Sequence, residues 1–289
     1  MHHPGFTLQS LTTRHSPRSH PAVQHLRRWL AVPVIAVLAG CAATVPDTLV
    51  IDRSISSPNH SSRVQFVVLH YTVGDLSRSL NQFTRGEVST HYLITDDEPA
   101  RILQLVDENR SAWHAGISQW RGRTWLNASS IGIEIVNPGF KENPDGTLIW
   151  QPYSESQIRA VMLLLRDIMQ RHGIKPENVV GHSDIAPTRK LDPGPLFPWK
   201  RLADAGLARW YDPAAFDAAR ARFAMFGLPD IAWFQQQLAK AGYEVPQHGE
   251  LDDNTRKVLR AFQMRFRPLN IDGTPDVETA AILAALNQQ

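Results

Sequence analysis

Apolar positions divide this chain into two parts with different periods. Before about Pro213 they come in short runs that are rich in Val, Ile and Leu and are bounded by polar or turn-forming residues. Runs of this length and composition are typical of strands that are buried in a sheet. Five runs predict strands, at 65–71, 91–94, 102–106, 131–136 and 179–180.

The run at 131–136 indicates which side chains face each side of its strand. Its three isoleucines occupy alternate positions, and alternate residues of a strand share one face. Gly132 and Glu134 therefore lie on the opposite face. The pattern therefore predicts that one carboxylate, that of Glu134, lies on a strand whose other residues are apolar and suited to burial.

Between these strands, 154–172 has the pattern of an amphipathic helix. Ser154 and Gln157 are spaced as a capping box, and Gly173 supplies a C-terminal stop. A Pro-rich loop is expected over 183–198. Since strands alternate with helical segments, the chain predicts an α/β domain with a central mixed β-sheet flanked by helices.

After about Pro213 the apolar residues follow a helical period instead. A short repeat recurs here: Gly-x-x-Asp-x-x-Thr begins at Gly249 and again at Gly273. An Asp at such a position is a good N-cap, so each copy predicts the start of a helix. We expect a small all-α helical bundle that is separate from the preceding domain.

The N-terminal segment has the features of an export signal. Arg27 and Arg28 precede an apolar run at 29–38, which is too short to span a bilayer comfortably. The run leads into Leu-Ala-Gly and then Cys41, and this resembles the bacterial lipobox, whose cysteine is lipidated. Residues 1–41 are therefore expected to be a lipoprotein signal peptide, and the alternative is a plain secretory signal with an incidental cysteine.

The resemblance also implies a location. Ala42 stands where an Asp would imply retention in the inner membrane, so we expect an outer-membrane lipoprotein that faces the periplasm of a Gram-negative bacterium. A lipid at Cys41 would provide the membrane attachment. Residues 42–60 are rich in Pro, Ser, Thr and Asp and predict a tether.

Charge and cysteine content exclude some classes of protein. Cys41 is the single cysteine, so no internal disulfide can form. The formal net charge of +2 becomes −2 without the four arginines of residues 1–40, which contain no acid. The remaining chain has no basic patch that would indicate a nucleic-acid partner.

Candidate chemistry gathers at the predicted strand ends. His70 lies near the end of the first strand, His182 follows the run at 179–180, and Asp192 lies ten residues further on. Two histidines and one carboxylate suit a catalytic Zn²⁺ with a fourth position open. Each residue also has an ordinary interpretation, because a lone His at a strand end is often structural and an Asp before Pro is often a turn residue.

Five ordered motifs make the pattern more specific. Together they resemble the zinc-dependent N-acetylmuramoyl-L-alanine amidases, whose fold is shared with peptidoglycan recognition proteins, over roughly 60–212. The motifs are Val68-Leu69-His70-Tyr71-Thr72, Ser89-Thr90-His91-Tyr92-Leu93-Ile94, Ala112-Trp113-His114-Ala115-Gly116, Ile131-Gly132-Ile133-Glu134-Ile135 and the stretch from Gly181-His182-Ser183-Asp184 to Lys190-Leu191-Asp192-Pro193-Gly194.

This resemblance implies a role for each matching residue. It implies that His70, His182 and Asp192 bind one Zn²⁺ per chain. It further implies that Glu134 is the catalytic acid and base and that Lys190 stabilises the oxyanion. The implied reaction is hydrolysis of the amide between N-acetylmuramic acid, or its 1,6-anhydro form, and L-alanine in peptidoglycan or its fragments.

Other matching residues are expected at the substrate. The resemblance implies that His91 and His114 line the substrate cleft, with core packing as the alternative. Trp113 could form an apolar wall beside a sugar or peptide, or could equally pack in the core. Residues 226–289 resemble a peptidoglycan-binding domain, for which a spacer role is the alternative, and 213–225 would be the linker that follows the catalytic domain at 61–212.

Two rival functions remain in view. A non-catalytic peptidoglycan-binding protein of the same fold would typically lack a metal ligand, whereas His70, His182 and Asp192 are all present. A zinc peptidase or glycosidase is disfavoured, because the chain has no His-Glu-x-x-His motif and no supported pair of carboxylates for glycoside chemistry.

Overall fold

The computed structural model describes residues 48–288. The predicted signal peptide, its Cys41 and the start of the predicted tether lie outside this range. Residues 48–60 contain no helix or strand, and their side chains are exposed. Across residues 48–288, no helix has both the length and the apolar composition that crossing a membrane requires.

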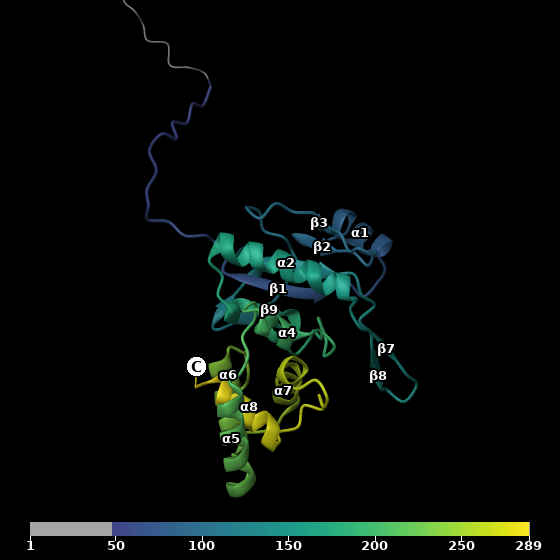
Figure 1. Cartoon of the computed structure of the whole chain (residues 1–289), viewed down its shortest axis with the longest axis vertical. Helices are drawn as coiled ribbons and strands as arrows, with labels where there is room; N and C mark the ends of the chain where they lie inside the picture. Colours follow the sequence, from purple (N-terminus) through teal and green to yellow (C-terminus); the bar gives the residue numbers. More distant parts are fainter. Residues whose placement is uncertain (1–47, 289) are drawn as a thin grey trace, which may run out of the picture. The chain divides into compact units, whose positions relative to one another are not determined.

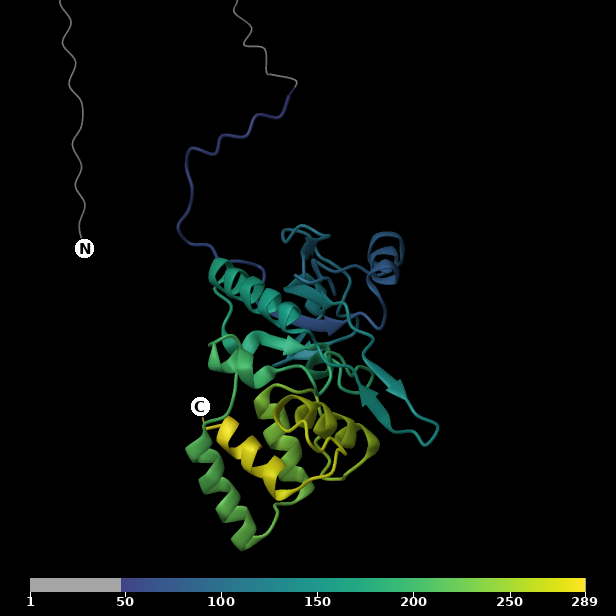
Figure 2. The same cartoon turned by 45° about the vertical axis from the view of Figure 1, so that its right-hand side comes forward.

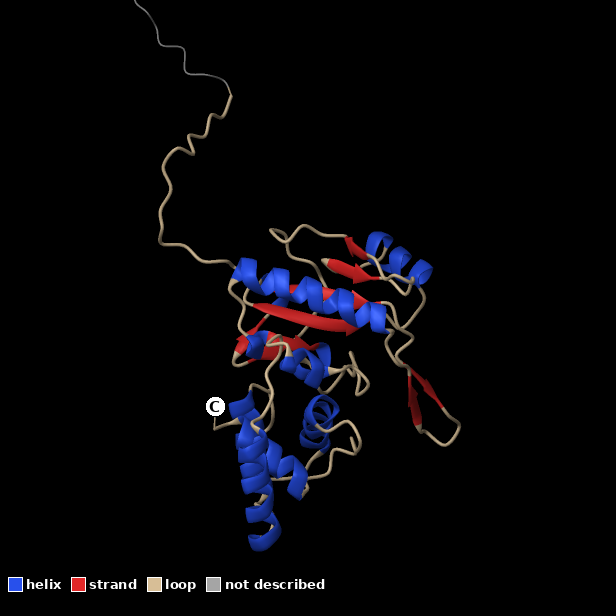
Figure 3. Ribbon diagram, in the orientation of Figure 1, coloured by secondary structure: helices blue, strands red, loops and turns tan. Residues whose placement is uncertain are grey.

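A five-stranded sheet forms the centre of the structure (Figure 3). Only β3 runs antiparallel to its neighbour; the other pairs are parallel. All five predicted strands are confirmed to within two residues, so the predicted α/β fold with a mixed sheet is correct. Their order across the sheet is β3 (Ile102–Gln104), β2 (Tyr92–Ile94), β6 (Ser130–Ile135), β1 (Phe66–Tyr71) and β9 (Val179–Gly181).

Helix α2 (Glu155–His172) lies across one face of this sheet (Figure 1). Ser154 and Gln157 form the expected capping box, and Gly173 ends the helix in the left-handed conformation. The three isoleucines of β6 are buried in the same core cluster as the apolar stripe of α2. The opposite face of β6 is therefore free to carry Glu134.

Shorter elements surround the sheet. The expected loop at 183–198 begins as a helical turn, because the side chain of Asp184 accepts a hydrogen bond from the backbone N–H of Gly181. These elements are α1 (Leu76–Arg85), the hairpins β4 (Gln119–Trp120)–β5 (Arg123–Thr124) and β7 (Phe140–Glu142)–β8 (Leu148–Trp150), the 3₁₀ turns η1 (Leu126–Ala128) and η2 (Pro176–Asn178), α3 (His182–Ile185) and α4 (Trp199–Asp204).

The C-terminal region is helical, as predicted, and the residues expected to be a linker, 213–225, are part of it. They form most of α5, because Asp212 caps the helix and Ala219 and Phe223 are buried. Helix α5 packs along α8, and Figure 2 shows the two side by side. The four helices of this region are α5 (Pro213–Phe226), α6 (Ile231–Ala241), α7 (Asp253–Phe266) and α8 (Val277–Leu286).

Two buried glutamines organise the repeated motif. The amide of Gln235 accepts a hydrogen bond from Gly249 N–H and donates to Thr255 Oγ1. Gln263 makes the corresponding bonds to Gly273 and Thr279. Each copy of Gly-x-x-Asp-x-x-Thr therefore wraps around the amide of the preceding helix, which explains why the glycine and threonine recur together.

The helical region packs directly against the sheet of the α/β domain. Phe66, Val68 and Val180 of the sheet belong to one core cluster with residues of α5, α6, α7 and α8. Burying the apolar face of the sheet on the apolar faces of these helices removes both from water. Residues 57–288 consequently form one compact unit.

A buried ion pair crosses this contact. Nη1 of Arg265, on α7, donates to Oδ2 of Asp184 at 2.6 Å, and the two side chains are 4% and 1% exposed. Tyr243 donates its hydroxyl to the other carboxylate oxygen, also at 2.6 Å. Asp184 lies two residues after His182, so the helical region is bonded directly to the turn that carries this histidine.

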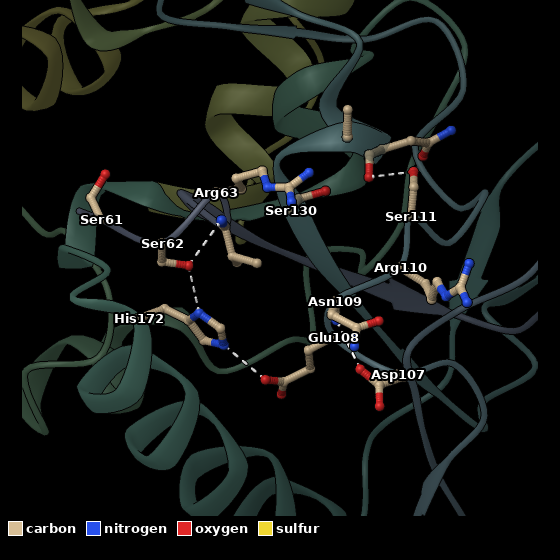
Figure 4. Close-up of a pocket in the computed structure, with 13 residues that line it drawn as sticks. Ser61, Ser62, Arg63, Asp107, Glu108, Asn109, Arg110, Ser111, Ser130 and His172 are labelled. Carbon is tan, nitrogen blue, oxygen red and sulfur yellow. Dashed lines mark hydrogen bonds and ion pairs between the residues drawn. The ribbon is translucent and has the colours of Figure 1, made fainter. Parts of the chain in front are cut away.

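Ser62, His172 and Glu108 form a second polar cluster, at the end of the sheet where β1 begins (Figure 4). Ser62 Oγ lies 2.7 Å from Nδ1 of His172, and Nε2 of His172 lies 2.7 Å from Glu108. Arg171 and Tyr92 also donate to this carboxylate. The cluster therefore connects Ser62, just before β1, to His172 at the C-terminal end of α2.

Removal of this carboxylate is expected to destabilise the fold in a pH-dependent way. Burial raises the pKa of Glu108, but hydrogen bonds from Arg171, Tyr92 and His172 outweigh it and lower the pKa to about 2. The carboxylate therefore contributes stability above its unfolded pKa of about 4.3 and loses it as the pH falls toward 2. Glu108→Gln should cost about 1–2 kcal/mol at pH 7, measured by urea unfolding.

The pH dependence supplies the control. The difference between wild type and Glu108→Gln should shrink as the pH is lowered from 5 to about 3. Asp97→Asn breaks an ion pair with Arg101 whose side chains are 42% and 58% exposed, so it should cost about 0.5 kcal/mol or less. Equal costs for the two variants would contradict the role given to Glu108.

Candidate metal centre and active site

Three buried side chains converge at the C-terminal ends of β1 and β9. Nδ1 of His70 lies 2.9 Å from Nδ1 of His182 and 2.9 Å from Oδ2 of Asp192, and His182 Nδ1 lies 3.0 Å from the same oxygen. The three side chains are almost fully buried. The structure thus brings together the three residues that the sequence pattern proposed as ligands.

The chemistry of these donors fits a metal ion. Nε2 of His182 faces the carbonyl oxygen of Ala115 at 3.1 Å, and a carbonyl can only accept, so this nitrogen carries the proton. A neutral His182 then presents a lone pair at Nδ1, directly toward the carboxylate of Asp192. Two electron-rich atoms at 3.0 Å repel each other unless a cation lies between them, and His70, His182 and Asp192 can hold one.

Electrostatics keep these ligands in the forms that bind metal. Burial and the neighbouring His182 lower the pKa of His70 to about 4, against the opposing effect of Asp192. Burial alone would raise the pKa of Asp192, but His182 and His70 outweigh it and hold that pKa below its ordinary value. At neutral pH the site therefore offers a neutral imidazole and an ionised carboxylate.

Glu134 lies beside this cluster on the neighbouring strand. The sheet register pairs Glu134 with His70, so both side chains leave the same face. Glu134 Oε1 is 4.0 Å from His70 Nδ1, while Oε2 is buried and has no hydrogen-bond partner within residues 48–288. Burial, and then repulsion from Asp192, raise the pKa of Glu134 well above its ordinary value, and Lys190 opposes this.

A cavity of about 140 Å³ opens onto this cluster. Lys190, half-buried, lines it together with the metal-site residues and Glu134. Trp113 and His114 line it too. Trp113 is 64% exposed, so it does not pack in the core, and its indole is available at the cavity rim.

His91 takes a different position from the one expected. Its side chain is fully buried and is not part of the cavity lining. Nδ1 accepts a hydrogen bond from Gly132 N–H at 3.0 Å, and Nε2 lies 3.2 Å from the carbonyl of Arg110. Both ring nitrogens are thus used by the backbone, so His91 packs beneath the site instead of lining it.

Local hydrogen bonds explain how the cavity wall is held. The side-chain carbonyl of Asn127 accepts hydrogen bonds from the N–H groups of His114 and Ala115, at 3.1 and 2.8 Å. Ser89 bonds to both backbone groups of Trp113. Sequence reasoning did not single out Asn127 or Ser89, because their partners are 12 to 24 residues away.

Comparison with known proteins agrees with the fold and the site. Residues 60–195 match the N-acetylmuramoyl-L-alanine amidase family, and residues 228–283 match a peptidoglycan binding domain family. The chain is similar to the N-acetylmuramoyl-L-alanine amidase AmiD of Escherichia coli (strain K12), with 42% identity over 267 residues, which cover 89% of this chain and 96% of AmiD.

Solved structures extend the likeness to three dimensions. AmpDh3 from Pseudomonas aeruginosa, in complex with anhydromuramic pentapeptide, is 45% identical with a TM-score of 0.77, covering 83% of this chain and 98% of AmpDh3. Escherichia coli AmiD, in complex with anhydro-N-acetylmuramic acid-L-Ala-D-gamma-Glu-L-Lys, is 42% identical with a TM-score of 0.74, covering 82% and 94%. With this identity over nearly the whole of AmiD, the chain belongs to the N-acetylmuramoyl-L-alanine amidase family.

Proposed function

We propose that this chain uses one zinc ion to hydrolyse the amide bond between N-acetylmuramic acid and the L-alanine of the stem peptide. The observation that carries the proposal is the buried cluster of His70, His182 and Asp192, with the unpartnered oxygen of Glu134 beside it. Two imidazoles and a carboxylate that leave one position open are typical of catalytic zinc sites. When bound, zinc supplies Lewis acidity, which lowers the pKa of water toward about 7 and polarises a carbonyl.

Glu134 moves the proton in this scheme. The attacking water adds its oxygen to the amide carbon, and Glu134 takes its proton through the unpartnered Oε2. Glu134 then gives the proton to the alanine nitrogen as the carbon–nitrogen bond breaks. The raised pKa of Glu134 favours the first half of the transfer, because it makes the carboxylate a stronger base toward the proton of water.

Lys190 and the cavity wall complete the scheme. Lys190 lines the cavity, and its ammonium would stabilise the oxyanion that develops on the carbonyl, by roughly 3–4 kcal/mol. His114 and the exposed face of Trp113 would contact the sugar or the peptide. His91 has no direct contact in this proposal, since it is buried away from the cavity.

The substrate is proposed to be peptidoglycan or its fragments. The ligands of AmpDh3 and AmiD in their solved complexes support acceptance of 1,6-anhydromuramic peptides. Residues 226–289 would bind the wall, supported by the match of 228–283 to a peptidoglycan binding domain family. We further propose that a lipid on Cys41 anchors the protein to the outer membrane, facing the periplasm, with 42–60 as the tether.

Product analysis tests the reaction. Purified peptidoglycan and anhydromuropeptides should be incubated with the zinc-loaded protein, with and without a chelator, and analysed by mass spectrometry. We expect release of peptides with a free L-alanine amino terminus, which the chelator abolishes and added zinc restores. A new reducing sugar would indicate a glycosidase, and binding without release would favour the non-catalytic alternative.

A further inference from the structure

We infer that His114 and Ser130 are positioning residues that fix the tautomer of His70, so that its Nδ1 lone pair faces the metal position. The inference rests on the zinc site proposed above and concerns the side chains that orient His70 within it. Ser130 begins β6, and the ring of His114 lies between Ser130 and His70.

The direction of the first hydrogen bond follows from Ser130. Its Oγ lies 2.6 Å from the carbonyl oxygen of Leu126, which can only accept, so the hydroxyl proton points there. The same Oγ lies 3.2 Å from Nε2 of His114 and has no other proton to donate. Nε2 of His114 must therefore carry a proton and donate it to Ser130.

The second hydrogen bond follows from the first. A neutral His114 protonated at Nε2 has a lone pair at Nδ1, and this atom lies 3.1 Å from Nε2 of His70. His70 must then donate from Nε2, which leaves its Nδ1 unprotonated. That Nδ1 is the atom that faces His182 and Asp192 at 2.9 Å. The other tautomer of His70 would set two lone pairs against each other at 3.1 Å.

The fold makes a dedicated space for the His114 ring. A Cβ placed on Gly132 would lie 2.5 Å from Cγ of His114, so only glycine leaves room for the ring on this face of β6. His91 packs edge-on against the ring at 5.7 Å, and Asn127 holds the backbone of His114. The position of the ring is therefore set by its surroundings, as a relay between Ser130 and His70 requires.

The two metal-binding histidines are thus oriented by different means. His182 donates directly to the backbone carbonyl of Ala115, whereas His70 donates to a side chain whose own tautomer depends on Ser130. A partner that holds the second nitrogen of a metal-binding histidine commonly matters 10- to 100-fold for metal affinity. The orientation of His70 can consequently be disturbed from Ser130, which does not contact the metal site.

Metal affinity and tautomer spectra test this inference. Zinc affinity of the full chain would be measured by competition with a chromogenic chelator for wild type, His114→Phe and Ser130→Ala. We expect zinc to bind roughly 10- to 100-fold more weakly to His114→Phe. For Ser130→Ala we expect zinc binding to be about 10-fold weaker. Long-range ¹H–¹⁵N spectra of the zinc-loaded chain should show a protected Nε2–H on His70 in wild type and a faster-exchanging one in both variants.

Ser129→Ala is the matched control. Ser129 is also buried, and its Oγ has no hydrogen-bond partner among residues 48–288, so its loss should leave zinc affinity and the spectra unchanged. Zinc affinities within twofold of wild type in both test variants, with an unchanged His70 spectrum, would overturn the inference. A wild-type chain that fails to bind zinc would instead overturn the proposed function, so the two failures are distinguishable.

Discussion

Glu134→Gln is expected to lower kcat/KM by about 10²- to 10⁴-fold while leaving the zinc content unchanged. A glutamine has nearly the same shape but cannot accept the proton of the attacking water or deliver it to the alanine nitrogen. Glu134 Oε1 lies 4.0 Å from His70 Nδ1, outside the tight cluster of the three proposed ligands, so metal binding does not depend on it. Release of free alanine amino termini and zinc analysis on the same preparation provide the measurement.

Two further variants sharpen this result. Glu134→Ala should behave in the same way, since the proton transfer is lost with either replacement. Glu142→Gln changes an exposed glutamate of β7 and should retain wild-type activity. Near-normal turnover in Glu134→Gln would refute its assignment as the base, and loss of zinc would show that it acts as a ligand.

Arg265→Met is expected to destabilise the fold by about 3–5 kcal/mol. The variant leaves Asp184 ionised in a site where its side chain is 1% exposed, and a buried charge without its partner is costly. It also removes a hydrogen bond to the carbonyl of Val179 and a guanidinium that lies 4.0 Å above the ring of Trp199. Chemical unfolding of the zinc-loaded chain, monitored by fluorescence, gives the free energy directly.

Arg267→Met is the comparison for this prediction. Arg267 is equally buried and pairs with Asp276, but that carboxylate is 36% exposed and remains solvated when the pair is broken. We expect a cost of about 1 kcal/mol. The double variant Asp184→Asn/Arg265→Met should recover part of the loss, because no unpaired charge remains. Similar costs for the two single variants would mean that Asp184 is not held mainly by Arg265.

The strands and the proposed ligands could be predicted because both depend on local pattern. Apolar runs located β1 and β6 to within one residue, and alternation alone put Glu134 on the face that carries the site. His70 and His182 stand at strand ends, and the parallel pairing of β1 with β9 brings such ends together. Spacing alone did not decide whether Asp192 is a metal ligand or a turn residue, and the motif resemblance favoured the ligand.

The parts that escaped prediction depend on contacts between distant residues. His91 matched a motif as well as His114 did, yet hydrogen bonds to Gly132 and Arg110 bury it. Residues 213–225 were expected to be a linker, whereas they form most of α5, and the buried Ala219 and Phe223 gain a core only because α5 packs against α8. A signal for α1 was present, since Asp75 is placed as its N-cap.

The bond between Asp184 and the helical region also limits how such a chain can be recombined. A peptidoglycan binding domain that is joined only by a flexible connector could be exchanged for another without disturbing the enzyme. Here a replacement domain would need a cationic side chain at the position of Arg265 and a hydroxyl at the position of Tyr243, because both groups bond to Asp184. The new domain would also have to bury Phe66 and Val68 of the sheet. A domain with a different binding specificity could therefore replace this one only if its surface also packs against the sheet.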